Sequence, residues 1–232
     1  MPDPDALPGP PDDIRPGQLG VVLLGRVIIG DIAATLVDLS IRRLLRVQEP
    51  DGEPGGWLIS PLQASAPRYR RDSLLRYEQI LLDGLAGDGT GASLPTLAPR
   101  MPRVLGHARE ALMHDAVHHG WLRHLHHDQR TETGEQLATR IRGFQRRLRQ
   151  AARDPARKDL LTGPLLPYAM HFGMVGDDQH PLVSFARCWV DTFADLPGWH
   201  EPAPEPPNPL NDPVPKGNNW SAMPAYGYGY PR

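Results

Sequence analysis

Apolar side chains recur at helical spacing over most of the region between residues 17 and 200. Pro16 suits the first position of a helix, which predicts a short helix from there to Leu24. Residues 31–46 are apolar on most sides and leave only a narrow charged strip, so this helix is expected to be central and buried. The same periodicity predicts further helices over residues 73–85, 101–125 and 182–196, and one that begins at Thr133.

Two short segments of alternating polarity follow the buried helix. They cover residues 45–48 and 57–60 and are joined by an acidic stretch rich in Gly and Pro, which is typical of a β-hairpin. Two helices followed by a hairpin is the layout of a winged helix, and the helical pattern starts again after residue 67. The predicted fold class is mainly α with small β-hairpins (α+β), with tandem winged-helix-like units plus C-terminal helices.

Proline separates a folded body from two ends. Six of the 27 prolines fall in residues 1–16 and nine in residues 202–232, and neither end has apolar periodicity. The predicted organisation is a disordered Pro/Asp-rich tail (1–16), a winged-helix-like unit (17–66), a second helical winged-helix-like unit with C-terminal helices (67–200) and a disordered Pro-rich tail with an aromatic end (201–232).

Composition narrows the class of protein. The 25 Lys and Arg nearly balance the 27 Asp and Glu, so no field of the whole chain attracts nucleic acid or an anionic membrane. One cysteine excludes a disulfide framework and fits a reducing compartment, which favours a cytoplasmic location. No segment has the length and apolarity of a membrane span, and the first residues lack the features of a signal peptide.

Three blocks of sequence recur in an order that is known from one family. They are the run GVVLLGRVIIGDIAATLVDLSIRRLLRVQE, the pair GFQRRLRQA and LLPYAMHFGM, and the closing WVDTFADLPGWH. Together they resemble the cytoplasmic C-terminal domain of the YciQ-like predicted membrane proteins. The resemblance implies a helical domain of unknown function, here without the membrane spans and extracytoplasmic β-sandwich of that family, and it supplies no catalytic residue.

The charges of the first unit do not suit DNA. A DNA-binding winged helix inserts the N-terminal end of its recognition helix into the major groove and lays a basic wing along the phosphates. Here that helix would begin with Asp31 and carry Asp38, and the hairpin tip carries Glu49, Asp51 and Glu53. Carboxylates at these places repel phosphates, so we expect the first unit to contact protein or to be structural.

The second unit is basic, with 13 Lys and Arg against six Asp and Glu in residues 100–158. Arginines decorate the helix whose other face holds the apolar stripe Leu137, Ile141, Phe144 and Leu148. One interpretation is a solvated face whose arginine stems cover apolar surface. The other is a docking surface for nucleic acid, an acidic lipid face or the protein's own acidic N-terminal tail. The candidate binding residues are Arg140, Arg142, Arg146, Arg147 and Arg149.

Seven of the ten histidines lie in residues 107–127. His107, His114 and His118 fall within about 20° of one direction around a helix. His114 and His118 also have the spacing of helical metal ligands, so they are the candidates for a weak metal site. The His-Glu-x-x-His motif is absent and the apolar positions lie opposite, which favours a stripe that faces water; the alternatives are the weak metal site and a contact that is sensitive to pH.

Nucleophilic chemistry has little support in the sequence. Cys188 lies in an apolar helix, where a lone cysteine is more often a buried small hydrophobe than a nucleophile. A triad of Cys188 with His171 and Asp191 lacks any nucleophile-turn motif.

The C-terminal tail has one feature of its own. Its aromatic residues Trp220, Tyr226, Tyr228 and Tyr230 stand among Gly, Pro, Asn and Ser. Exposed aromatics on a Pro-rich string can act as a linear ligand for a partner protein, and the alternative is a disordered tail without a partner.

The sequence therefore favours a non-enzymatic interaction or scaffold protein, with no cofactor, that binds a protein partner through the arginine-faced helix, the acidic hairpin tip or the aromatic tail. The alternative is a DNA-binding winged-helix regulator that uses the second unit. A third hypothesis is an enzyme or metal-binding protein that uses residues 107–127. The oligomeric state stays open.

Overall fold

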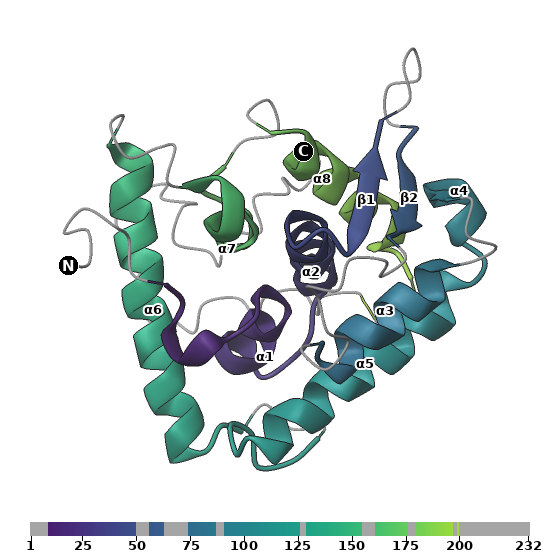
Figure 1. The fold of residues 1–232 in the computed structure, drawn as a ribbon. Coiled ribbons are helices and arrows are strands. Elements are labelled where there is room, and N and C mark those ends of the chain that lie inside the picture. Colours follow the sequence, from purple (N-terminus) through teal and green to yellow (C-terminus); the bar gives the residue numbers. More distant parts are fainter. Residues whose placement is uncertain are drawn as a thin grey trace, which may run out of the picture.

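The computed structural model describes residues 9–49, 56–62, 74–86, 91–125, 129–154, 161–175, 180–196 and 199. This part of the chain is mainly helical with a small antiparallel sheet, which confirms the predicted fold class (Figure 1). Its elements are η1 (Pro11–Asp13), η2 (Pro16–Gln18), α1 (Leu19–Leu24), α2 (Ile29–Ile41), β1 (Leu45–Gln48), β2 (Leu58–Pro61), α3 (Arg76–Ala86), β3 (Ala92–Ser93), α4 (Leu94–Leu97), α5 (Met101–His118), α6 (Glu132–Arg153), η5 (Gly163–Leu165), α7 (Leu166–His171) and α8 (Pro181–Phe193).

Helix α2 lies at the centre of the molecule (Figure 1). Every residue from Ile29 to Leu39 is buried, because η2, α7, α8 and β1 pack around the helix. The predicted central helix is confirmed, but it ends at Ile41 rather than at residue 46. Arg43 takes a left-handed φ of 59°, and the Leu44 N–H donates to the Leu39 carbonyl at 2.9 Å, which closes the helix as a Schellman motif does.

The predicted hairpin is present, and its sheet has a third strand. Strands β1 and β2 pair antiparallel, with Val47 opposite Ile59. Strand β3, which follows α3 along the chain, pairs with the other side of β2 and places Ala92 opposite Ile59. The second predicted unit thus adds a strand to the sheet of the first, and the tandem winged-helix layout stays a prediction. The acidic tip with Asp51 and Glu53 lies outside the described residues.

Two groups of buried side chains join the helices. The larger group surrounds α2 and includes residues of the sheet, α3, α5 and α8. The second group joins α6 to α1 and α7. It contains the predicted stripe of α6, whose members are at most 1% exposed: Leu137, Ile141, Phe144 and Leu148. Helix α6 forms one margin of the molecule in Figure 1, so its other face is turned away from the core.

The start of α6 differs from the sequence prediction. Thr131, and not Thr133, caps the helix, because the Gly134 N–H donates to the Thr131 hydroxyl at 3.1 Å. A Cβ on Gly134 would lie 2.1 Å from the carbonyl oxygen of Trp121, so the chain before the helix passes too close for any larger residue. The sequence near Thr133 could not reveal this approach, because it involves two different segments of the chain.

The end of α5 also differs from the prediction. The helix ends at His118 rather than at residue 125. Gly120 takes a left-handed φ of 67°, and the Trp121 N–H donates to the Ala116 carbonyl at 2.8 Å, which stops the helix.

Candidate functional site

Arginines cover the solvent face of α6. Arg140, Arg142, Arg146, Arg147 and Arg153 are exposed and Arg149 is half-buried. The helix has glutamates only in its first turn and no Asp or Glu from residue 136 to 153. The predicted basic face is therefore where the sequence placed it, and its binding role stays a prediction.

The arginines of α6 form two separate rows. At about 100° per residue, Arg142, Arg146, Arg149 and Arg153 fall within an arc of about 60°. We call these four residues the arginine stripe. Arg140 and Arg147 lie on the other side of the solvent face, between the stripe's far edge and the core. The stripe covers twelve residues of helix, and the eleven steps between its ends span about 16 Å along the axis.

The two rows differ in their partners. Arg140 pairs with Asp12 of the N-terminal segment, with 2.5 Å between Nη1 and Oδ1. No arginine of the stripe has an ion pair with another described residue. The guanidinium groups of the stripe thus present several exposed donors, in a geometry that suits carboxylates or phosphates.

The segment that carries Asp12 is anchored on the second core. Ile14 is only 2% exposed and packs with residues of α6 and α7. Tyr168 donates its hydroxyl to the Ile14 carbonyl at 2.6 Å, and burial raises the pKa of Tyr168, so the hydroxyl keeps its proton. The sequence predicts disorder over residues 1–16, whereas the structure gives residues 9–16 a defined path held by the Ile14 side chain, the Tyr168 hydrogen bond and the Asp12–Arg140 ion pair.

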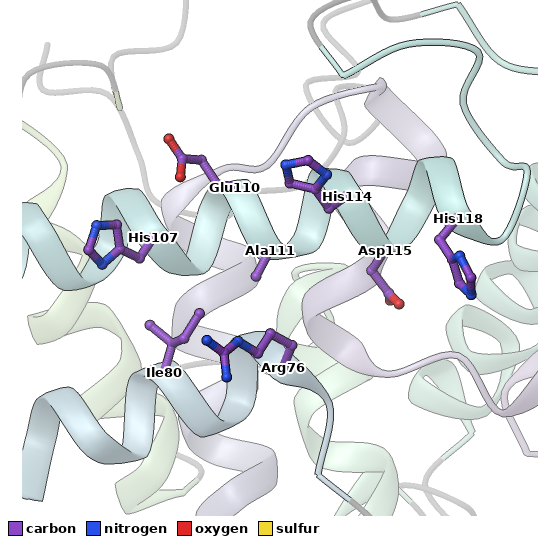
Figure 2. Close-up of a pocket in the computed structure, with 8 residues that line it drawn as sticks. All are labelled: Arg76, Ile80, His107, Glu110, Ala111, His114, Asp115 and His118. Atoms are coloured by element: carbon purple, nitrogen blue, oxygen red, sulfur yellow. The ribbon is translucent and has the colours of Figure 1, made fainter.

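The histidines of α5 face solvent, as predicted. His107, His114 and His118 are exposed. They border a shallow groove of about 520 Å³ between α3 and α5 (Figure 2). Figure 2 shows Arg76 and Ile80 of α3 beside the helix that carries these histidines.

Among the described residues, the groove has no set of ligands for a metal ion. In the described part of the chain, no group of three His, Cys, Asp or Glu side chains could hold a metal. Asp115, the nearest acid to His118 on the groove, accepts from Gln18 Nε2 at 2.6 Å and pairs with His119 at 3.2 Å. His114 and His118 therefore stand as a pair without a third ligand among the described residues.

Sequence reasoning missed a buried polar stripe on α2. Asp31, Thr35 and Asp38 are each at most 7% exposed and lie on one side of the helix. Asp31 accepts from the N–H groups of Gly20 and Ile28, both at 2.9 Å. A DNA-binding winged helix would need Asp31 at the exposed tip of its recognition helix, whereas the structure buries Asp31, in agreement with the predicted central and buried helix. The sequence could have indicated this role, because Asp31 stands three residues after Ile28, at the position where an acid closes a capping box.

A buried ion-pair network continues the polar stripe. The Arg42 guanidinium bonds Asp38 at 2.9 Å and Glu78 at 2.8 Å, and Arg15 approaches Glu78 at 4.0 Å. Glu78 is fully buried and also accepts from the Leu75 N–H at 3.0 Å. The network ties α2 and α3 to the N-terminal segment.

The surroundings of Cys188 and His171, the candidate nucleophile and base, indicate a structural role for both residues. His171 is buried, with Nδ1 3.5 Å from Asp31 Oδ1, and burial lowers the pKa of His171 to about 3. Cys188 is half-buried, and partial burial raises the pKa of its thiol above the ordinary value. A thiol that keeps its proton is a poor nucleophile, which agrees with the prediction of a small hydrophobe.

Comparison with protein-family models, curated proteins and solved structures finds no match for the chain. The resemblance to the YciQ-like family therefore stays a prediction. Among the described helices, none combines the length and the apolarity needed to cross a membrane. The predicted binding residues of the C-terminal tail, Trp220, Tyr226, Tyr228 and Tyr230, lie outside the described residues.

Proposed function

We propose that this chain is a non-enzymatic interaction protein that binds an acidic segment of a partner protein on the arginine stripe of α6. The observation that carries the proposal is the row Arg142, Arg146, Arg149 and Arg153, which lies on the solvent face without an ion pair to another described residue. Four cations along about 16 Å match an extended chain with several carboxylates.

A second contact on the same helix supports a protein ligand. Asp12, which is 128 residues away in sequence, already bonds Arg140 through its carboxylate. The surface of α6 thus accepts an acid that comes from a Pro-rich segment. A partner segment of similar composition would meet other guanidinium groups of the same helix on the stripe.

The alternative is a DNA-binding regulator. Helix α2, the recognition helix of the winged-helix layout, is buried from Ile29 to Leu39, which leaves no face for a DNA groove. Phosphates would then bind only to the arginines of α6, without base readout. The stripe has no aromatic residue among its arginines, which also disfavours stacking with single strands.

Fluorescence anisotropy tests the proposal. The probe is a labelled peptide of alternating Asp and Ser, titrated with the full chain at 50 and 200 mM salt. The double variant Arg142→Glu/Arg146→Glu should bind it about tenfold more weakly, since exposed ion pairs contribute up to about 1 kcal/mol each and 1.4 kcal/mol is a factor of ten.

The matched control is Arg46→Glu/Arg103→Glu, which makes the same change of charge at exposed sites on β1 and α5. It should leave the affinity within about twofold of the wild type, because these arginines lie outside the stripe. Equal weakening by both double variants would contradict the proposal. A labelled 20-base-pair duplex that binds more tightly than the peptide, with a steep salt dependence, would favour the regulator instead.

The remaining features of the hypothesis follow from the sequence. A cytoplasmic location and membership of the YciQ-like family are proposals that agree with the helical fold and the single cysteine. An enzyme or metal protein built on the histidines has the weakest support, because the groove offers no third ligand among the described residues.

A further inference from the structure

The N-terminal segment lies on α6 as a ligand would. Residues 9–14 run from Gly9 to Ile14 and contact α6 through η1. Two of their side chains make the attachment: Asp12 reaches Arg140 at the edge of the helix, and Ile14 is inserted in the core between α6 and α7. The attachment therefore combines one charged and one apolar contact, two residues apart.

The apolar contact occupies a defined socket. Ile14 packs in the same group of side chains as Ile141 and Phe144 of α6. The Tyr168 hydroxyl holds the Ile14 carbonyl at 2.6 Å, so the socket also fixes the backbone of whatever segment enters it. The socket offers an apolar space for a side chain, the Tyr168 hydroxyl as a donor and the Arg140 guanidinium. No described residue N-terminal to Asp12 contributes to these three features.

The backbone of the segment is in an uncommon conformation. Asp12 and Asp13 have φ values of 54° and 53°, in the left-handed region that residues with a Cβ seldom occupy. Two such residues in succession oppose the attachment. The side chain of Asp12 is also 48% exposed, so water competes with Arg140 for its carboxylate.

We propose that Arg140 and the Ile14 socket form a peptide-binding site that residues 9–14 occupy in cis, and that a partner segment with a carboxylate two residues before an Ile or Leu binds there in trans. The proposal rests on the proposed function of α6 as a docking helix and names the motif that it takes.

The cis segment has the advantage of its effective concentration, because its linkage to the body makes binding intramolecular. A free peptide with the same contacts should therefore bind the wild-type chain weakly and bind a chain with a weakened cis segment strongly. This difference is a property of a shared site and is not expected for peptide binding elsewhere on the surface.

The test uses a labelled peptide of residues 6–16 (ALPGPPDDIRP) and the full chain. The opened variant, Asp12→Asn/Ile14→Ala, should bind the peptide at least tenfold more tightly than the wild type in fluorescence anisotropy. Addition of Arg140→Glu to the opened variant should remove most of that gain, whereas addition of Arg46→Glu should not. A peptide that carries the Asn and Ala substitutions should not bind.

Equal affinity of the wild type and the opened variant would overturn the proposal, as would an absence of peptide binding to an opened variant that is folded by circular dichroism. If the loss of Ile14 unfolds the chain, the single variant Asp12→Asn keeps the apolar contact. This single variant should then bind the peptide more tightly than the wild type does. If its affinity equals that of the wild type, the proposal is overturned. Because this readout depends on Arg140 and not on Arg142 or Arg146, its failure is distinguishable from failure of the arginine stripe.

Discussion

Helices α2 and α6 carry polar stripes with the same spacing and opposite surroundings. In α2 the positions are Asp31, Thr35 and Asp38 with the C-cap residue Arg42, and in α6 they are Arg142, Arg146, Arg149 and Arg153. Each set follows i, i+4, i+7 and i+11, which places its members on one side of a helix. The first set is enclosed by protein, and the second faces solvent.

The difference between the two stripes lies in their partners. Buried polar groups are tolerated only when they are hydrogen-bonded, and the α2 stripe has mixed charge with donors and acceptors around it. Asp31 meets two backbone N–H groups, and Arg42 meets two carboxylates. The α6 stripe has four like charges, which can only be stable in water or against an acidic ligand. The spacing of polar residues therefore does not show what a stripe does. Its charges and its contacts distinguish a structural stripe from one that is available to a ligand.

The largest effect is expected at Asp31. Asp31→Ala leaves the N–H groups of Gly20 and Ile28 buried without their acceptor, so we expect a loss of about 3–5 kcal/mol in the free energy of unfolding. Urea unfolding followed by circular dichroism measures it. Asp191→Ala, at an exposed position of α8, should change the same quantity by less than about 0.5 kcal/mol. A small loss of unfolding free energy in Asp31→Ala would contradict this role of the carboxylate and show that the two N–H groups do not need it.

The next largest loss of stability is expected at Gly20, which lies beside Asp31. A Cβ on Gly20 would lie 2.1 Å from Asp31 Oδ2, so Gly20→Ala must displace the carboxylate or α1. We expect a destabilisation of about 1–3 kcal/mol, typical of an overfilled core. Gly106→Ala is the matched control, because a Cβ there meets nothing within 4 Å and alanine favours the α5 helix. A neutral Gly20→Ala would contradict the close approach of α1 to α2.

Much of this arrangement could be predicted from the sequence. The hairpin, the central position of α2 and the core face of α6 follow from local periodicity. The third strand could not, because β3 has two residues and pairs with a segment more than thirty residues earlier. The burial of Asp31 and Asp38 was missed because α2 is covered on all sides, and the sequence shows which positions are polar but not how many neighbours surround a helix.

The arginine face was predicted better than its contacts. The six arginines stand opposite a regular apolar stripe, so their exposure follows from the periodicity of one helix. The pairing of Asp12 with Arg140 joins residues 128 positions apart and depends on the socket of Ile14. A Pro- and Asp-rich segment has no periodicity of its own, so its contacts with the folded body could not be predicted from it.

A pH effect on stability should come from His171, beside Asp31. Burial lowers its pKa to about 3 from the ordinary 6.5, so the unfolded chain binds a proton there that the folded chain excludes. This contribution is fully present above pH 6.5 and is lost as the pH falls toward 3, at up to about 1.4 kcal/mol per pH unit. The Asp31 carboxylate at 3.5 Å acts in the opposite direction and reduces the slope.

Urea unfolding at pH 7.5, 6.5 and 5.5 measures this dependence. His171→Gln should flatten it, since glutamine does not titrate. His107→Gln, at an exposed site on α5, should leave the dependence as it is in the wild type. An identical acid loss in the wild type and His171→Gln would assign the effect to other groups.

The smallest effect is expected on the α6 stripe, and it completes the contrast with α2. Arg142→Gln/Arg146→Gln removes two charges that have no ion pair with another described residue, so the free energy of unfolding should change by less than about 0.5 kcal/mol. The same variant should weaken binding of the acidic peptide several-fold at low salt, because the lost charges act only on a ligand. Differential scanning fluorimetry and anisotropy on one protein sample give both quantities. A large loss of stability would mean that these arginines hold the fold together, as Arg42 does in α2, and would remove the reason to regard them as a docking surface.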